Sequence, residues 1–222
     1  MMAQGQARAG DVKVDERRRR AAARFGMWVF LATELMLFGP LFLGYVYART
    51  HFPAAFAAAS RHTDFWLGTI NTGVLLTSSM AMALALAAHE RAGPSAARTA
   101  ARWLVLAALL GIAFLVIKGT EYGHDWQHHW FPGPRFRFAP RYAGGAELFY
   151  FLYFALTGLH ALHLTIGVLI SLGFALGLRL AAAPMRPPVR LELLGLYWHF
   201  VDLIWIFLYP ILYLVGRSSA GG

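Results

Sequence analysis

Five stretches of this chain are apolar over the length that a helix needs to cross a bilayer, and they limit its fold more than any other feature. They lie near residues 25–48, 65–88, 102–121, 147–178 and 191–216. A membrane-spanning helix needs about 20 predominantly apolar residues, and these runs are continuous rather than alternating. Backbone groups in lipid must be satisfied within helices or closed barrels, and continuous runs favour helices. The sequence therefore predicts an all-α polytopic membrane protein with a bundle of five transmembrane helices.

Composition agrees with this prediction and excludes several classes of protein. Only 14% of the 222 residues are charged and the mean hydropathy is +0.50, whereas a soluble domain carries about 25% charged residues. The chain has no cysteine, which excludes disulfides, thiolate catalysis and cysteine-ligated metals. The net charge of +9 gathers in the N-terminal tail and in loops beside the spans. No nucleic acid partner is expected, because no solvated face combines basic and aromatic residues.

The chain divides into a polar, basic N-terminal tail, residues 1–23, and a membrane domain, residues 24–217. We expect the tail to be disordered on the membrane surface. A signal peptide is the competing interpretation. The run 25–48 is too long for the apolar core of a signal peptide and contains Glu34, so the signal peptide is disfavoured.

Proline and glycine mark the expected turns, and one polar segment marks an expected loop. Turns are predicted at Gly93 and Pro94, and again at Pro184, Pro187 and Pro188. The polar segment 122–146 is predicted to be a long extramembrane loop.

The distribution of lysine and arginine predicts the orientation. With the N-terminus in the cytoplasm, thirteen of these residues lie on the inner side and seven on the outer side. Short cytoplasmic segments carry the excess of basic residues in membrane proteins. We therefore expect a cytoplasmic N-terminus and a C-terminus outside.

Glu34 lies in the middle of the first span, within FLATELMLFG. A carboxylate there costs about 2.5 kcal/mol or more on insertion scales, so it must face the bundle. One interpretation is a buried, protonatable carboxylate in a proton relay or in contact with lipid. The other is an interhelical hydrogen bond without further function. The residues alone leave both open.

Other polar side chains in the spans are expected to hold helices together or to contact lipid headgroups. His160 and His163 are three residues apart on one predicted helix, as are His199 and Asp202 on another. Glu121 closes the third span after Lys118, a lysine expected to extend toward the headgroups. A metal site at either histidine pair is disfavoured, because no ligand set of suitable geometry is visible.

Small polar residues in the second span are expected to bond across helix interfaces. They are Asn71, Thr72, Thr77, Ser78 and Ser79.

The segment HDWQHH, with His124, His128 and His129, is the sharpest enzyme motif in the chain. It resembles one histidine box of the membrane di-iron desaturases and hydroxylases. Such enzymes need several boxes that converge on two irons, and the remaining histidines form no second box. Because short motifs match by chance, we favour a polar interfacial loop.

Five stretches, in order along the chain, resemble subunit III of the haem–copper oxidases. They are MWVFLATELMLFG (27–39), INTGVLLTSS (70–79), KGTEYGHDWQHHWFPG (118–133), FYFLYFALTGLHALHLTIG (149–167) and YWHFVDLIWIFLYPILYL (197–214). Longer members of that family have seven helices. This chain lacks the first two and resembles the five-helix bacterial form.

The resemblance implies a subunit without a catalytic centre of its own, in the bacterial cytoplasmic (inner) membrane. No cofactor or metal is expected in this chain, since haem and copper belong to partner subunits. The implied partners are subunit I by direct packing, subunit II in the same complex, and membrane lipids, with bound phospholipid. Subunit III is expected to support rapid proton uptake and to protect subunit I from inactivation. Glu34 matches the family's carbodiimide-reactive carboxylate.

Three hypotheses remain at this point. The first is a subunit of a cytochrome c oxidase, which the loop HHWFPGPRF mildly favours. The second is a subunit of the same form in a quinol oxidase or a nitric oxide reductase. The third is a membrane di-iron oxygenase built around HDWQHH.

Overall fold

The computed structural model of the chain describes residues 2–91, 94–180, 188–214 and 216, and these residues confirm the all-α fold class. Every regular element among them is helical. The elements are α1 (Met2–His51), α2 (Pro53–His62), α3 (Phe65–His89), α4 (Pro94–Gln127), η1 (Pro140–Tyr142), α5 (Ala143–Arg179), α6 (Pro188–Tyr209) and η3 (Pro210–Leu214).

Five helical segments among the described residues are long and apolar enough to cross a membrane, as the fold prediction required. Each of the five predicted runs overlaps one of them. The segments are Asp15–His51, Phe65–His89, Ser95–Gln127, Pro140–Arg179 and Val189–Leu214.

The local sequence explains where several of these helices begin and end. Asp64 caps α3, because its carboxylate accepts hydrogen bonds from the backbone N–H groups of Trp66 at 3.0 Å and Leu67 at 3.1 Å. Proline begins α2, α4 and α6, where its missing N–H costs nothing. At Pro210 the same missing donor ends the regular α-helical pattern of α6, and the chain continues as the π-helical turn η3.

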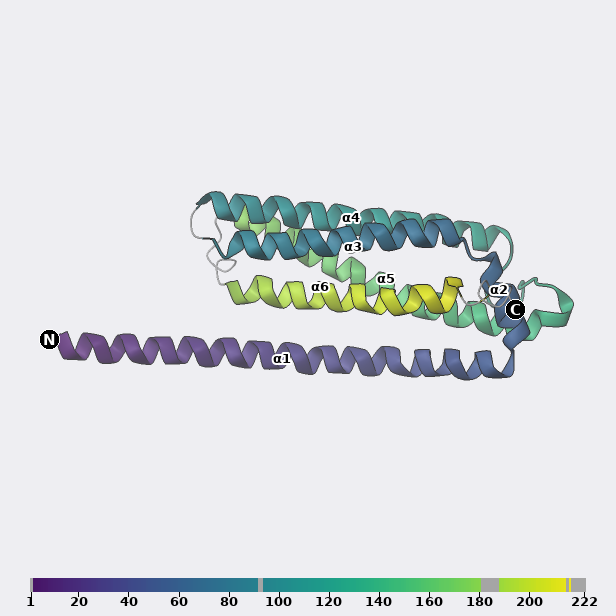
Figure 1. The fold of residues 1–222 in the computed structure, drawn as a ribbon, viewed down its shortest axis with the longest axis horizontal. Coiled ribbons are helices and arrows are strands. Elements are labelled where there is room, and N and C mark those ends of the chain that lie inside the picture. Colours follow the sequence, from purple (N-terminus) through teal and green to yellow (C-terminus); the bar gives the residue numbers. More distant parts are fainter. Residues whose placement is uncertain (1, 92–93, 181–187, 215, 217–222) are drawn as a thin grey trace.

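The helices form a bundle with the N-terminus of α1 at one end and the short helix α2 at the other (Figure 1). α3, α4, α5 and α6 pack on one another, while α1 runs along α5 and α6. α2 and the connection between α4 and α5 lie at the end opposite the N-terminus. Alanines bring α3 and α4 close together, as small residues do in membrane bundles. The fully buried members of this set are Ala85, Ala100, Ala101, Ala107 and Ala108.

Most of the small polar residues of α3 bond to other helices, as expected. Asn71 donates to the carbonyl of Phe114 on α4 at 3.3 Å, and Ser78 donates to Ala107 at 2.9 Å. Thr72 accepts from the Trp205 indole on α6 at 3.0 Å. The prediction is wrong for Thr77, which bonds to Gly73 in its own helix.

Two segments differ from the sequence-based predictions. α1 extends back to Met2, so residues 2–23 are helical rather than disordered. Alanine and arginine, both good helix formers, dominate the part that joins the span. The predicted loop 122–146 is also shorter than expected, because α4 continues to Gln127 and α5 begins at Ala143. The predicted turn residues Gly93, Pro184 and Pro187 lie outside the described residues.

Candidate functional site

Glu34 on α1 meets His163 on α5. The His163 Nε2 atom lies 2.7 Å from the Glu34 Oε2 atom, and the two side chains are 10% and 15% exposed. Phe38, fully buried one turn along α1, packs against the imidazole ring at 5.4 Å between centroids. The pair therefore joins the outlying helix α1 to the rest of the bundle.

The hydrogen bonds of His163 limit how this pair can be protonated. Its Nδ1 atom lies 2.8 Å from the Leu159 carbonyl oxygen, and because a carbonyl only accepts, Nδ1 must carry a proton. Nε2 and Glu34 then share the remaining one. Either a protonated Glu34 donates to neutral His163, or an imidazolium donates to the carboxylate. Both forms are neutral overall, which suits a position inside a membrane span.

A groove of about 600 Å³ opens beside this pair, between α1, α5 and α6. Glu34 and His163 line one part of it, Arg190 lines another, and most of the remaining wall is apolar. In the same turn of α6 as Arg190, Glu192 forms an ion pair with Arg24 of α1 at 2.9 Å. The apolar wall consists of Met27, Phe30, Ile166, Ile170, Phe174, Leu193, Leu194 and Tyr197.

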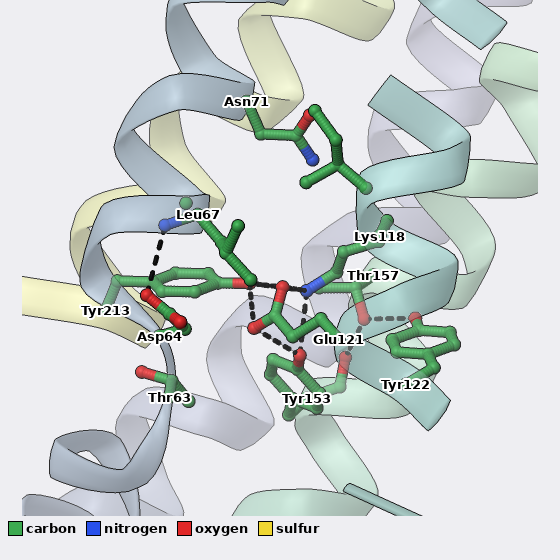
Figure 2. A network of polar contacts seen from close by, with 12 residues as sticks. Thr63, Asp64, Leu67, Asn71, Lys118, Glu121, Tyr122, Tyr153, Thr157 and Tyr213 are labelled. Carbon is green, nitrogen blue, oxygen red and sulfur yellow. Dashed lines mark hydrogen bonds and ion pairs between the residues drawn. The ribbon is translucent and has the colours of Figure 1, made fainter. Parts of the chain in front are cut away.

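A second polar centre lies inside the bundle around Lys118 and Glu121 (Figure 2). Lys118 donates to Glu121 at 2.9 Å, to the Tyr153 hydroxyl at 2.8 Å and to the Tyr213 hydroxyl. Both tyrosines in turn donate to the Glu121 carboxylate, at 2.9 and 2.8 Å. The three ammonium protons thus all have acceptors, and the Lys118 and Glu121 side chains are only 3% and 5% exposed.

This centre corrects the sequence-based interpretation of Lys118, which does not extend toward the headgroups. It also explains why α4 runs past the predicted end of its span, since these polar groups are satisfied inside the bundle. Asp125 is buried one turn further along α4, and Tyr122 bonds to Thr157 of α5 at 2.5 Å. Tyr153 and Tyr213 were not predicted from the sequence as partners of this ion pair. The spacing of three between Lys118 and Glu121 was the signal for an ion pair on one helix face.

His160 does not share the environment of His163. Its ring lies between Phe114 of α4 and Trp205 of α6, at centroid distances of 5.4 and 5.2 Å. It is 1% exposed, and neither ring nitrogen has a hydrogen-bond partner among the described residues. Three residues turn a helix by about 300°, so side chains three apart point about 60° away from each other around the helix axis. This difference is enough for the two histidines to contact different neighbours.

His199 and Asp202 lie on α6 at the edge facing α3. The His199 Nδ1 atom is 4.0 Å from the Asp202 carboxylate, too far for a hydrogen bond, and 2.8 Å from the Ser79 hydroxyl. Asp202 is buried, whereas the His199 side chain is 45% exposed. The close partner of His199 is therefore a serine of another helix rather than Asp202, which lies three residues further along its own helix.

The histidines of HDWQHH lie at the end of α4 and in the connection after it. The His124 and His128 ring centroids lie 4.1 Å apart with the rings tilted by 39°, and His128 Nδ1 donates to the His124 carbonyl at 2.9 Å. His129 follows with a positive φ of 58°. In the described part of the chain, no three histidine or carboxylate side chains come together as metal ligands would.

Comparisons with known proteins show which family the chain belongs to. A family model described as cytochrome c oxidase subunit III matches residues 16–217. The chain is 28% identical to cytochrome bo(3) ubiquinol oxidase subunit 3 of Pseudomonas aeruginosa over 86% of its own length and 84% of that protein. It is 30% identical to cytochrome c oxidase subunit 3 of Synechocystis, covering 86% and 75%. It is 28% identical to quinol oxidase subunit 3 of Bacillus subtilis, covering 87% of each. Because the match extends over all five spans, the chain belongs to the cytochrome c oxidase subunit III family.

Proposed function

We propose that this chain is the non-catalytic subunit III of an aerobic haem–copper terminal oxidase, and that it supports a proton-pumping, dioxygen-reducing subunit I. The observation that carries the proposal is the family match over residues 16–217. The structure supports it because the Glu34–His163 and Lys118–Glu121 pairs bind their own helices together. Gentle solubilisation of the native membrane followed by affinity capture of this chain tests it. Haem must co-purify in a partner subunit, and capture of the folded chain alone would refute the proposal.

The proposed partners are subunit I in direct contact and subunit II in the same complex. The bundle exposes large apolar side chains on α1 and α3, among them Trp28, Met36, Leu43 and Met80. A membrane subunit must present such surfaces both to lipid and to its neighbours. Residue-specific crosslinking from these positions, followed by mass spectrometry, would identify the face that touches subunit I.

The supporting role has a measurable consequence. A strain without this chain is expected to assemble a subunit I that reduces dioxygen but loses activity during turnover sooner than the complete complex. The test compares the number of turnovers before half the activity is lost, with and without the chain. Equal lifetimes and equal rates of proton uptake would contradict the proposed role.

Cytochrome c is the electron donor that we propose, and quinol is the alternative. Quinol is a real alternative because relatives named as quinol oxidase subunits and relatives named as cytochrome c oxidase subunits have similar identities to this chain, 28–30%. Offering the purified complex reduced cytochrome c and a reduced quinol in separate assays decides between them. Oxidation of quinol alone would assign the chain to a quinol oxidase.

We further propose that a phospholipid occupies the groove beside Glu34 and His163. The apolar wall suits acyl chains, and Arg190 in the wall and Arg24 nearby offer positive charge to a phosphate. Replacing Ile170 by tryptophan would fill part of the groove without touching either ionisable pair. Native mass spectrometry of the complex should then show one retained phospholipid fewer. An unchanged lipid count would refute the assignment.

The proposed location is the bacterial cytoplasmic membrane, with the N-terminus inside and the C-terminus outside. If all five spans cross the membrane, the two termini lie on opposite sides. Lys118, counted on the outer side from the sequence, is buried in the bundle, so the excess of basic residues on the inner side becomes larger. Protease accessibility of the tail and of the connection 128–139 in sealed vesicles tests the orientation. Cleavage of the tail from the outer side would reverse it.

A further inference from the structure

A separate cavity of about 470 Å³ lies at the end of the bundle opposite the N-terminus. It is formed by α2, the connection 128–139 and η1. Arg61 and His62 of α2 and Arg141 of η1 line it, and no acidic residue is among its described lining residues. We propose that this cavity binds a phosphate group, and that the phosphate belongs to the headgroup of an anionic phospholipid. The proposal does not depend on the oxidase assignment.

Both arginines are held in position by contacts that leave donors for a ligand. The Arg61 Nε atom donates to the Gly216 carbonyl at 2.8 Å, which fixes the plane of the guanidinium. The Arg141 guanidinium carbon lies 4.5 Å from the centroid of the Tyr142 ring, so the group is supported by a cation–π contact. Among the described residues, these contacts leave the terminal N–H groups of both guanidinium groups available to an anion. A planar guanidinium with paired donors matches the geometry of phosphate oxygens.

The aromatic part of the cavity is firmly packed. The Trp130 ring lies 5.1 Å from His62 and stacks on Tyr150 at 5.7 Å, and Phe138 meets His62 edge-on at 5.4 Å. This wall offers an apolar surface beside the two cationic groups. A glycerol phosphate and the first methylenes of its acyl chains would find both surfaces in one cavity.

His62 contributes little positive charge itself. Partial burial, followed by the neighbouring positive charge of His128, lowers the pKa of His62 below its ordinary value of 6.5. At neutral pH the imidazole is therefore uncharged, and the positive charge of the cavity comes from its two arginines.

The position of the cavity favours a lipid over a soluble phosphate ester. α1 ends at His51 and α3 begins at Phe65, so α2 lies where two membrane spans end. Trp66, the second residue of α3, is exposed, and tryptophan is enriched at the boundary between the membrane and water. Phospholipid phosphates lie at this depth.

The test uses the full chain as purified from its native membrane, with or without partner subunits, and phosphatidylglycerol as the probe. Arg141→Gln removes one guanidinium whose contact among the described residues is the Tyr142 ring, so the variant is expected to fold. Its matched control is Arg137→Gln, which removes an exposed arginine of the neighbouring connection that does not line this cavity. Native mass spectrometry titrations should show phosphatidylglycerol affinity reduced about tenfold by the first change and less than about twofold by the control.

Two further measurements make the outcome decisive. Arg141→Lys keeps the charge but loses the paired donors, so an affinity between those of the wild type and the Gln variant is expected. Inorganic phosphate at millimolar concentration should not displace the lipid. Displacement by it would overturn the lipid source in favour of a soluble phosphate ester. Equal losses in the Arg141 and Arg137 variants, or no loss in either, would overturn the site itself.

Discussion

The Lys118–Glu121 pair permits the sharpest quantitative prediction. Replacing Lys118 by methionine removes three hydrogen bonds and the only ammonium group that touches the Glu121 carboxylate among the described residues. Two tyrosine hydroxyls still donate to that carboxylate, but its charge is left buried without a counter-charge. Breaking a buried ion pair from one side costs about 3 to 5 kcal/mol, so we expect the free energy of unfolding to fall by that amount.

The double variant Lys118→Met with Glu121→Gln separates the pair from the packing around it. The amide oxygen of glutamine still accepts from Tyr153 and Tyr213, methionine fills the space of the lysine stem, and no buried charge remains. Neutral replacements of buried ion pairs are often tolerated. The double variant should therefore lose about 1 kcal/mol or less. Glu121→Gln alone breaks the pair from the other side and should also lose about 3 to 5 kcal/mol, so the coupling energy between the two changes is about 5 kcal/mol or more.

Reversible unfolding of the purified chain in mixed micelles, followed by circular dichroism, measures these free energies. The two single variants and the double variant complete a thermodynamic cycle with the wild type. If the losses of the single variants simply add in the double variant, the two residues do not interact as the structure indicates. A single variant within about 0.5 kcal/mol of the wild type would equally contradict the reasoning.

Three further changes test other parts of the structure. Gly145→Ala should destabilise the chain by about 1 to 3 kcal/mol, because its Cβ would lie 2.6 Å from a Cβ atom of α2, whereas Gly144→Ala, with nothing within 4 Å, should cost nothing in the same unfolding assay. His62 should titrate below its ordinary pKa of 6.5 in an NMR pH series, and His128→Gln should move its pKa upward by removing a nearby positive charge. Because this lowered pKa means that the unfolded chain binds the proton more readily, the loop packing around His62 should weaken as pH falls through 6.5. Glu34→Gln should abolish carbodiimide labelling of the chain without preventing assembly, and undiminished labelling would place the reactive carboxylate elsewhere.

The architecture could be predicted from the sequence because a lipid environment restricts the folds that the chain can adopt. Each apolar run is long enough to span, and lipid leaves helices as the way to satisfy the backbone. The extent of the helices was harder to predict. Polar residues after Lys118 resembled the start of a loop, yet α4 continues to Gln127 because Glu121 and Lys118 satisfy each other inside the bundle. Local polarity does not distinguish an exposed loop from a buried ion pair.

The contacts of the site were beyond the sequence for a different reason. Glu34 and His163 are separated by 129 positions, and nothing local links a carboxylate on one apolar helix to a particular histidine on another. The spacing of His160 and His163 even favoured the wrong grouping, since it placed both on one face. Three-dimensional packing assigns His163 to α1 and His160 to the ring cluster between α4 and α6.

The pairing of polar and charged side chains within the spans indicates which surface of this subunit needs a partner outside the chain. Glu34 shares a proton with His163, and Lys118 neutralises Glu121, so both pairs are already satisfied inside the chain. Asp202 differs, because it is buried and the His199 ring nitrogen that faces it stays 4.0 Å away. His199 itself is half exposed on the bundle surface and bonds only to Ser79 among the described residues. A polar group that stays exposed on a membrane-facing surface needs a partner outside the chain. The edge formed by Ser79 and His199 is therefore the first surface to examine for contact with a neighbouring subunit.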